Sequence, residues 1–160
     1  MNKILFSSIL LSSILLGESI DSREGLSGDL GLGISSIDYK TEKLTSTLLN
    51  SKVSYGLSQK FVLYGESLLS SESSSLLIGG KYFIENINST PYIIGAIGKS
   101  STELYNLKES NSFGKTYKVG LGYELNSWFI EGSYLQSTSK NINDFNSFNL
   151  LLGKSFYSLF

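Results

Sequence analysis

Hydrophobic and polar residues alternate along most of the chain after residue 26, with the period of two that is typical of β-strands. The clearest segment is 117–125, where the odd positions carry Tyr, Val, Leu, Tyr and Leu and the even positions carry Lys, Gly, Gly and Glu. Segment 29–35 alternates in the same way between Leu or Ile on one side and Asp, Gly or Ser on the other. Each such strand therefore has one apolar face and one polar face.

Eight segments share this pattern, and each is close to the ~9–11 residues that a tilted strand needs to cross a bilayer. The fifth is apolar on both faces, so the pattern does not say which of its faces points inward. We predict an all-β fold, an eight-stranded antiparallel up-and-down transmembrane β-barrel, in one domain over 20–160. The predicted strands are 27–37, 46–58, 60–70, 74–84, 91–101, 115–125, 128–138 and 146–156.

The connections between these segments fall into two groups, of which one is longer on average. Outer-membrane barrels have short periplasmic turns and longer outer loops, which predicts that both chain termini lie on the periplasmic side. The outer connections are Asp38–Thr45, Ser71–Ser73, Thr102–Gly114 and Ser139–Phe145, and the periplasmic ones are Gln59, Glu85–Thr90 and Asn126–Ser127.

Aromatic residues gather near both ends of the segments, where amphipathic rings are expected to meet lipid headgroups. The alternative is that Tyr and Phe follow their general preference for strands. The group near the short turns is Phe61, Tyr82, Tyr92, Tyr123, Trp128 and Phe156, and the group near the outer ends is Tyr117, Tyr134 and Phe148.

The N-terminus has the organisation of a secretory signal. Lys3 supplies a positive charge, 4–16 is an apolar run, and Gly17 and Ser19 are small residues before a cleavage site. A helix over 4–16 would span about 20 Å, short of the ~30 Å hydrocarbon core. We therefore expect residues 1–19 to be cleaved from an exported protein.

The composition limits the chemistry. The chain has no cysteine, which excludes a disulfide framework, a thiolate zinc site and a lipoprotein anchor. It also has no histidine, the residue that most often transfers protons in hydrolases. We predict no enzymatic activity, no cofactor and no metal. A net charge of −1 predicts no nucleic-acid partner.

The polar faces carry charges of both signs. An eight-stranded barrel is just wide enough for side chains to fill it, so inward charges must pair. Three lysines against four acids predict a network that plugs the interior; the alternative is a narrow, gated ion path. The predicted inward set is Asp29, Lys52, Tyr64, Glu66, Lys81, Lys118, Glu124 and Glu131.

The longest outer connection is the best candidate for recognition, because it combines apolar residues with a polar background. Exposed apolar groups there would bind a surface protein or host ligand, unless they pack on one another or on the headgroup layer. These residues are Leu104, Tyr105, Leu107 and Phe113.

The last strand ends at a terminal aromatic residue. Phe156 and Phe160 share the parity of Leu152, and this pattern resembles the assembly signal of outer-membrane barrels. Together with 92–98 and 119–123, it resembles the small eight-stranded bacterial outer-membrane β-barrel family that includes OmpX-like proteins and OmpA-type transmembrane domains. The departures are Ser158, where the family has a hydrophobe or Tyr, and Lys154, on the predicted lipid face.

The resemblance covers the whole mature chain. It implies insertion by the barrel-assembly machinery and contact with outer-membrane lipid and lipopolysaccharide, but no single activity. We expect a structural or surface-interaction role, adhesion-like, through extracellular loops around a closed polar interior. The alternatives are a narrow porin-like channel and a soluble periplasmic lipocalin-like barrel that binds an apolar ligand.

Overall fold

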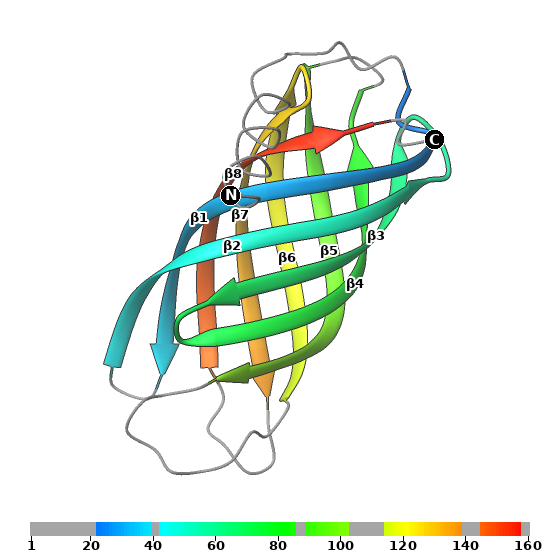
Figure 1. Cartoon of the computed structure of the whole chain (residues 1–160). Coiled ribbons are helices and arrows are strands. Elements are labelled where there is room, and N and C mark those ends of the chain that lie inside the picture. The colour runs from blue at the N-terminus through cyan, green and yellow to red at the C-terminus, as the bar shows by residue number, and fades with distance from the viewer. Residues whose placement is uncertain (1–21, 40–41, 86–88, 103–113, 139–144, 158–160) are drawn as a thin grey trace, which may run out of the picture.

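The computed structural model describes residues 22–39, 42–85, 89–102, 114–138 and 145–157. They form one closed antiparallel barrel in which neighbours along the chain pair in order and β1 pairs with β8 (Figure 1). No described segment is a helix long and apolar enough to cross a membrane. The strands are β1 (Gly25–Tyr39), β2 (Glu42–Gly56), β3 (Phe61–Ser70), β4 (Ser73–Phe83), β5 (Ser89–Thr102), β6 (Gly114–Leu125), β7 (Trp128–Thr138) and β8 (Phe145–Phe156).

The eight-stranded up-and-down barrel is confirmed, with one clear difference in its connections. The predicted outer connection Asp38–Thr45 is wrong, because β1 continues to Tyr39 and β2 already begins at Glu42. Asp38 lies directly opposite Lys43 in this hairpin. Polar side chains follow one another here, so the alternation that reveals the rest of the strand is lost while the backbone pairing persists.

The chain enters and leaves the barrel at the same end. We call this the terminal end, where β1 begins and β8 ends, and the opposite one the loop end (Figure 1). The turn between β6 and β7 at the terminal end is Asn126–Ser127, as the sequence predicts. Its φ angles of 47° and 68° are those of a two-residue hairpin turn whose twist matches that of the strands.

Apolar side chains cover the outside of the barrel. Leu32, Ile78 and Leu121 are 62%, 72% and 67% exposed. In β5, which the sequence left unassigned, Ile93 and Ile97 face outward and Tyr92 faces inward. The prediction that Tyr92 joins an outer aromatic group is therefore wrong; the ring fills interior space beside the small residue Gly122, directly opposite on β6.

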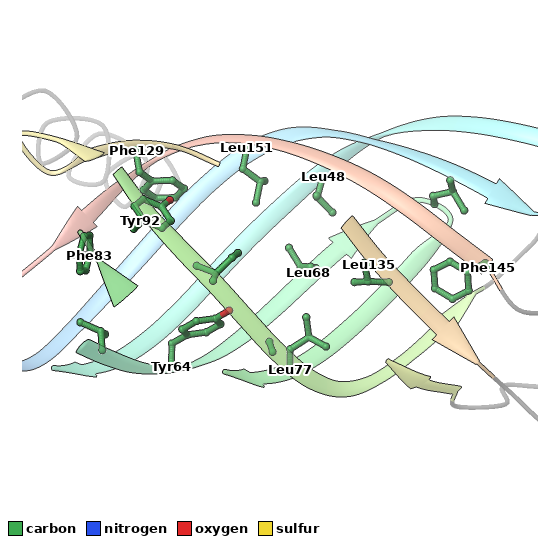
Figure 2. Packing of buried hydrophobic residues seen from close by; sticks show 14 residues of the cluster. Leu48, Tyr64, Leu68, Leu77, Phe83, Tyr92, Phe129, Leu135, Phe145 and Leu151 are labelled. Carbon is green, nitrogen blue, oxygen red and sulfur yellow. The ribbon is translucent and has the colours of Figure 1, made fainter. Parts of the chain in front are cut away.

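The interior combines charges with a set of apolar side chains. Figure 2 shows Phe83, Tyr92 and Phe129 gathered at one end of this set and Phe145 at the other. Glycines make room for the rings, since a β-carbon at Gly153 would lie 2.5 Å from Cζ of Phe129. The barrel is therefore filled by side chains, as expected at this strand number.

Candidate functional site

The structure places all eight predicted inward residues inside the barrel. Asp29, Lys52, Tyr64, Glu66, Lys81, Lys118, Glu124 and Glu131 are each at most 3% exposed. Seven of them take part in ion pairs. Tyr64 does not, and its hydroxyl has no hydrogen-bond partner among the described residues, although its ring lies 5.4 Å from the ammonium of Lys52.

Four of these charges form a ring across the barrel. Lys52 Nζ lies 2.6 Å from Glu131 Oε2 and 3.5 Å from Glu66 Oε1. Lys118 Nζ lies 2.9 Å from Glu131 Oε1 and 2.7 Å from Glu66 Oε1. Each ammonium thus contacts both carboxylates, and the ring is neutral.

The strand register explains how the ring forms. Lys52 on β2 lies directly opposite Glu66 on β3, while Lys118 and Glu131 come from the adjacent strands β6 and β7. These two strand pairs are on opposite walls of the closed barrel. The ring therefore ties one wall to the other and crosses the interior.

Neutral donors complete the coordination of the ring carboxylates. Asn50 Nδ2 donates to Glu66 Oε1 at 2.6 Å, and the Tyr92 hydroxyl donates to Glu131 Oε2 at 3.3 Å. A buried ion pair is tolerated when further hydrogen bonds satisfy its remaining lone pairs. These contacts favour a fixed network over mobile, exchanging charges.

A second pair lies between β4 and β1. Lys81 Nζ donates to Asp29 Oδ2 at 2.9 Å, and the ammonium lies 4.9 Å from the centre of the Tyr92 ring. Both charges are buried, so this pair also bridges the interior.

A third pair involves Arg23, whose place inside the barrel could not be predicted from the sequence. Arg23 Nε and Nη2 donate to Glu124 Oε1 at 3.1 and 3.0 Å, and the guanidinium lies 4.0 Å from the centre of the Phe83 ring. Arg23 precedes the first alternating segment, so its face could not be assigned. The available signal was the charge count: three lysines left one of four acids unmatched, and Arg23 balances it.

Backbone and side-chain contacts hold Arg23 at the terminal end. Its N–H donates to Gln59 Oε1 at 3.2 Å, and Nη1 donates to the Gln59 carbonyl at 3.4 Å. The Tyr157 hydroxyl, just after β8, donates to the second oxygen of Glu124. Burial and the nearby Glu124 carboxylate raise the pKa of Tyr157 well above its ordinary value.

The loop-end half of the interior holds hydroxyl groups instead of charges. Ser75 Oγ and Ser100 Oγ are 2.6 Å apart, and Thr116 Oγ1 lies 2.8 Å from Ser100 Oγ and 3.2 Å from Ser137 Oγ. Leu77, two residues after Ser75, and Leu135, two residues before Ser137, are also buried. The interior is thus charged in one part, whereas the other part holds neutral hydroxyl groups and apolar side chains.

The other residues singled out from the sequence lie near the end of β8 or outside the described residues. Leu104, Tyr105, Leu107, Phe113 and Phe160 lie outside the described residues, and Phe156 is the half-buried last residue of β8. Lys154 was predicted to face lipid, and the register places it on the outward side of β8, opposite Leu30 and Trp128. It is nevertheless only 5% exposed, and its ammonium lies 5.7 Å from the Phe156 ring centre.

The arrangement is suited to closing the barrel, because ion pairs cross its interior. Each of the four buried carboxylates has a cationic nitrogen within 3.0 Å. Within the described ranges no three acidic side chains are grouped as metal ligands.

No family model matches the chain, and no curated protein matches it. Solved structures do. Neisserial surface protein A is 11% identical with a TM-score of 0.61, covering 84% of this chain and 98% of that one. The outer membrane enzyme PagL is 12% identical with a TM-score of 0.60, covering 79% and 98%. Ail, the attachment invasion locus protein of Yersinia pestis, is 18% identical with a TM-score of 0.54, covering 83% and 99%.

The structural similarity shows a shared fold. At such low sequence identities it does not transfer residue roles from one protein to another. The match extends over nearly the full length of each solved barrel. This structural match agrees with the closed strand order, the apolar exterior and the charged interior of the barrel. This chain has the fold of the small eight-stranded β-barrels of bacterial outer membranes.

Proposed function

We propose that the protein spans the bacterial outer membrane as a closed barrel and acts through its loop end in a structural or surface-interaction role. Residues 1–19 would direct export and be removed. The terminal end would face the periplasm, and the connections after β5 and β7 would face outward. The barrel-assembly machinery would insert it, with Phe156 and Phe160 as the assembly signal.

The observation that carries the membrane location is the distribution of polarity. Exposed Leu, Ile and Val side chains cover the outside, whereas seven ion-pairing side chains and Arg23 are buried inside. A water-soluble exterior would carry many interspersed charges. An apolar outer band around a polar interior is the arrangement of transmembrane barrels.

The same distribution weighs against a lipocalin-like carrier, whose interior would have to accept an apolar ligand. It also weighs against an open channel, since the ring of Lys52, Glu66, Lys118 and Glu131 crosses the interior. PagL shows that this fold hosts an enzyme, so the fold alone does not decide the question. The paired state of the buried carboxylates supports a non-enzymatic role.

A surface-contact role is supported by the strand topology, since the two longest connections in the sequence, 103–113 and 139–144, join strand ends that lie at the loop end. Ail is named for attachment and invasion, and its structure was solved with the heparin analogue sucrose octasulfate. The apolar positions Leu104, Tyr105, Leu107 and Phe113 in the first connection are the residues we propose for contact with a surface protein or host ligand.

Cysteine labelling in intact cells tests the location and the orientation together. Ser71→Cys lies at the loop end and Glu85→Cys at the terminal end, and both positions are exposed. A membrane-impermeant thiol reagent should label only Ser71→Cys, and the protein should remain in the membrane after carbonate extraction. Release by carbonate, or labelling of Glu85→Cys alone, would overturn the proposal.

A further inference from the structure

Two exposed lysines face each other directly at the loop end of β5 and β6. Lys99 and Lys115 are paired in the strand register, and both point outward. Like charges directly opposite on one face of a sheet destabilise the pairing. Within the described ranges, neither ammonium lies within ion-pair distance of a carboxylate.

The loop end of the β1–β2 hairpin carries a pair of opposite charges instead of two like charges. At the loop end of β1 and β2, Asp38 lies directly opposite Lys43, and their charged atoms are 3.8 Å apart. The protein therefore has a neutral pair on one hairpin and a doubly positive pair on another. A positive pair at the edge of an apolar surface is suited to a negatively charged ligand that is itself partly apolar.

The surface next to the lysines continues as an apolar face toward the middle of the barrel. Ile97 and Tyr117 are the next outward pair, and they are 63% and 53% exposed. Beyond them lies a hollow lined by Ile93, Val119, Leu121, Tyr134 and Phe148. The hollow surrounds Gly132, an outward position where a β-carbon would meet only Phe148, at 3.9 Å.

The spacing between the lysines and the hollow fits one leaflet of a membrane. From position 115 to position 121 a strand extends about 20 Å, at ~3.3 Å per residue. Because barrel strands tilt by about 45°, this distance is about 14 Å along the membrane normal, close to half of the ~30 Å hydrocarbon core. An amphiphile with its headgroup at the lysines would place its acyl chain in the hollow.

We propose that this β5–β6 face, made of Lys99, Lys115, Ile97, Tyr117 and the hollow around Gly132, binds a phosphorylated glycolipid of the outer leaflet. The phosphate would lie between the two ammonium groups, and one acyl chain would fill the hollow. The inference rests on the proposed function, since it requires that the loop end lies in the outer leaflet.

The test compares lipid binding by the folded protein in nanodiscs of zwitterionic lipid that contain a small fraction of bisphosphorylated lipid A. The variants are K99Q/K115Q and, as the matched control, K43Q. The double variant should bind lipid A about 30-fold more weakly, which corresponds to ~1 kcal/mol per lysine. The control should bind like the wild type. Equal binding by K99Q/K115Q and wild type would overturn the proposal.

Three further arms distinguish the source of the phosphate and the role of the hollow. Dephosphorylated lipid A should bind weakly, and Gly132→Leu should weaken binding of lipid A by filling the hollow. Binding of phosphatidylglycerol as tight as that of lipid A, or full displacement of lipid A by inorganic phosphate, would overturn a glycolipid site. Unchanged binding by Gly132→Leu would overturn the acyl-chain assignment.

A failure of the proposed lipid site can be distinguished from a failure of the proposed membrane location. Heat-modifiable gel mobility of each variant reports whether the barrel is folded. If the wild type resists carbonate extraction while K99Q/K115Q still binds lipid A normally, the lipid site alone is wrong. If the wild type is released by carbonate, the proposed function itself fails.

Discussion

The ring of Tyr92 lies where any side chain at position 122 would have to go. Tyr92 and Gly122 are directly opposite on β5 and β6, and a β-carbon at position 122 would lie 2.1 Å from Cζ of Tyr92. The ring is 1% exposed, and its hydroxyl reaches Glu131. The absence of a side chain at Gly122 thus allows Tyr92 to fill the interior and, through its hydroxyl, to donate a hydrogen bond to the ion-pair network.

Gly122→Ala should therefore destabilise the barrel by about 1–3 kcal/mol, the usual cost of overpacking a filled interior. The matched control is Gly132→Ala on the outer surface, where there is space, and it should have little effect. Denaturant unfolding of detergent-folded protein, followed by gel mobility, measures both. Equal midpoints for Gly122→Ala and the wild type would show that the Tyr92 ring moves without cost.

Glu131→Gln should destabilise the barrel more strongly, because it leaves Lys52 and Lys118 sharing the single carboxylate of Glu66. Breaking one side of a buried ion pair costs about 3–5 kcal/mol. Adding Lys52→Met removes the excess cation and should restore a large part of the loss. A double-mutant cycle on these two positions measures the coupling, and additive effects would argue against the ring.

Arg23→Met should lower the free energy of unfolding by about 3 kcal/mol, because among the described residues it leaves the buried Glu124 with the Tyr157 hydroxyl alone as a hydrogen-bond partner. Glu24→Gln, one residue further along on an exposed side chain, is the control and should be nearly neutral. The same denaturant series measures both variants. Similar midpoints for Arg23→Met and wild type would mean that the N-terminal segment does not hold the terminal end closed.

The alternation of the sequence predicted the faces of β2, β4 and β7 well, because each strand carries a buried charge on its inner face, namely Lys52, Lys81 or Glu131, and exposed aliphatic and aromatic side chains on the opposite face. It could not predict the face of β5, where Tyr92, Ile93 and Ile94 are all apolar. There the side is decided by what lies across from Tyr92, namely Gly122. That is a relationship between strands, which the pattern within a single strand does not contain.

The partners of the charges were also beyond the pattern. Parity places Lys52 and Glu131 on the same inner side, but they are 79 positions apart, and only the register and closure of the barrel bring them to 2.6 Å. Arg23 lies before the first alternating segment, so no parity applied to it. The pattern therefore gave seven ion-pairing side chains of the interior but neither Arg23 nor the buried rings such as Tyr92, and the three-dimensional closure decided the pairs.

The wild-type protein in planar bilayers should show no large, stable conductance, because three sets of ion pairs and several apolar side chains fill the interior. Single-channel recording at both polarities checks this. A reproducible open conductance that Glu66→Gln or Lys81→Met abolishes would contradict a closed interior and favour the narrow channel.

Ionisation of Tyr157 should make the stability of the barrel depend on pH in the alkaline range. Its pKa in the folded state is raised above the ordinary value of about 10, because partial removal from water disfavours the charged form and Glu124 disfavours a second negative charge. The contribution of the protonated hydroxyl to stability is fully present below that ordinary value and is lost as the pH rises through the folded pKa. Tyr157→Phe cannot ionise, so it lacks this loss.

The stability difference between wild type and Tyr157→Phe should therefore be constant below pH of about 10 and move in favour of Tyr157→Phe above it. Other alkaline effects, such as deprotonation of lysines, are shared by the two proteins and cancel in the difference. Denaturant midpoints measured across the alkaline range provide the test. A difference that stays constant at every pH would mean that the Tyr157 hydroxyl is open to solvent and does not contact Glu124.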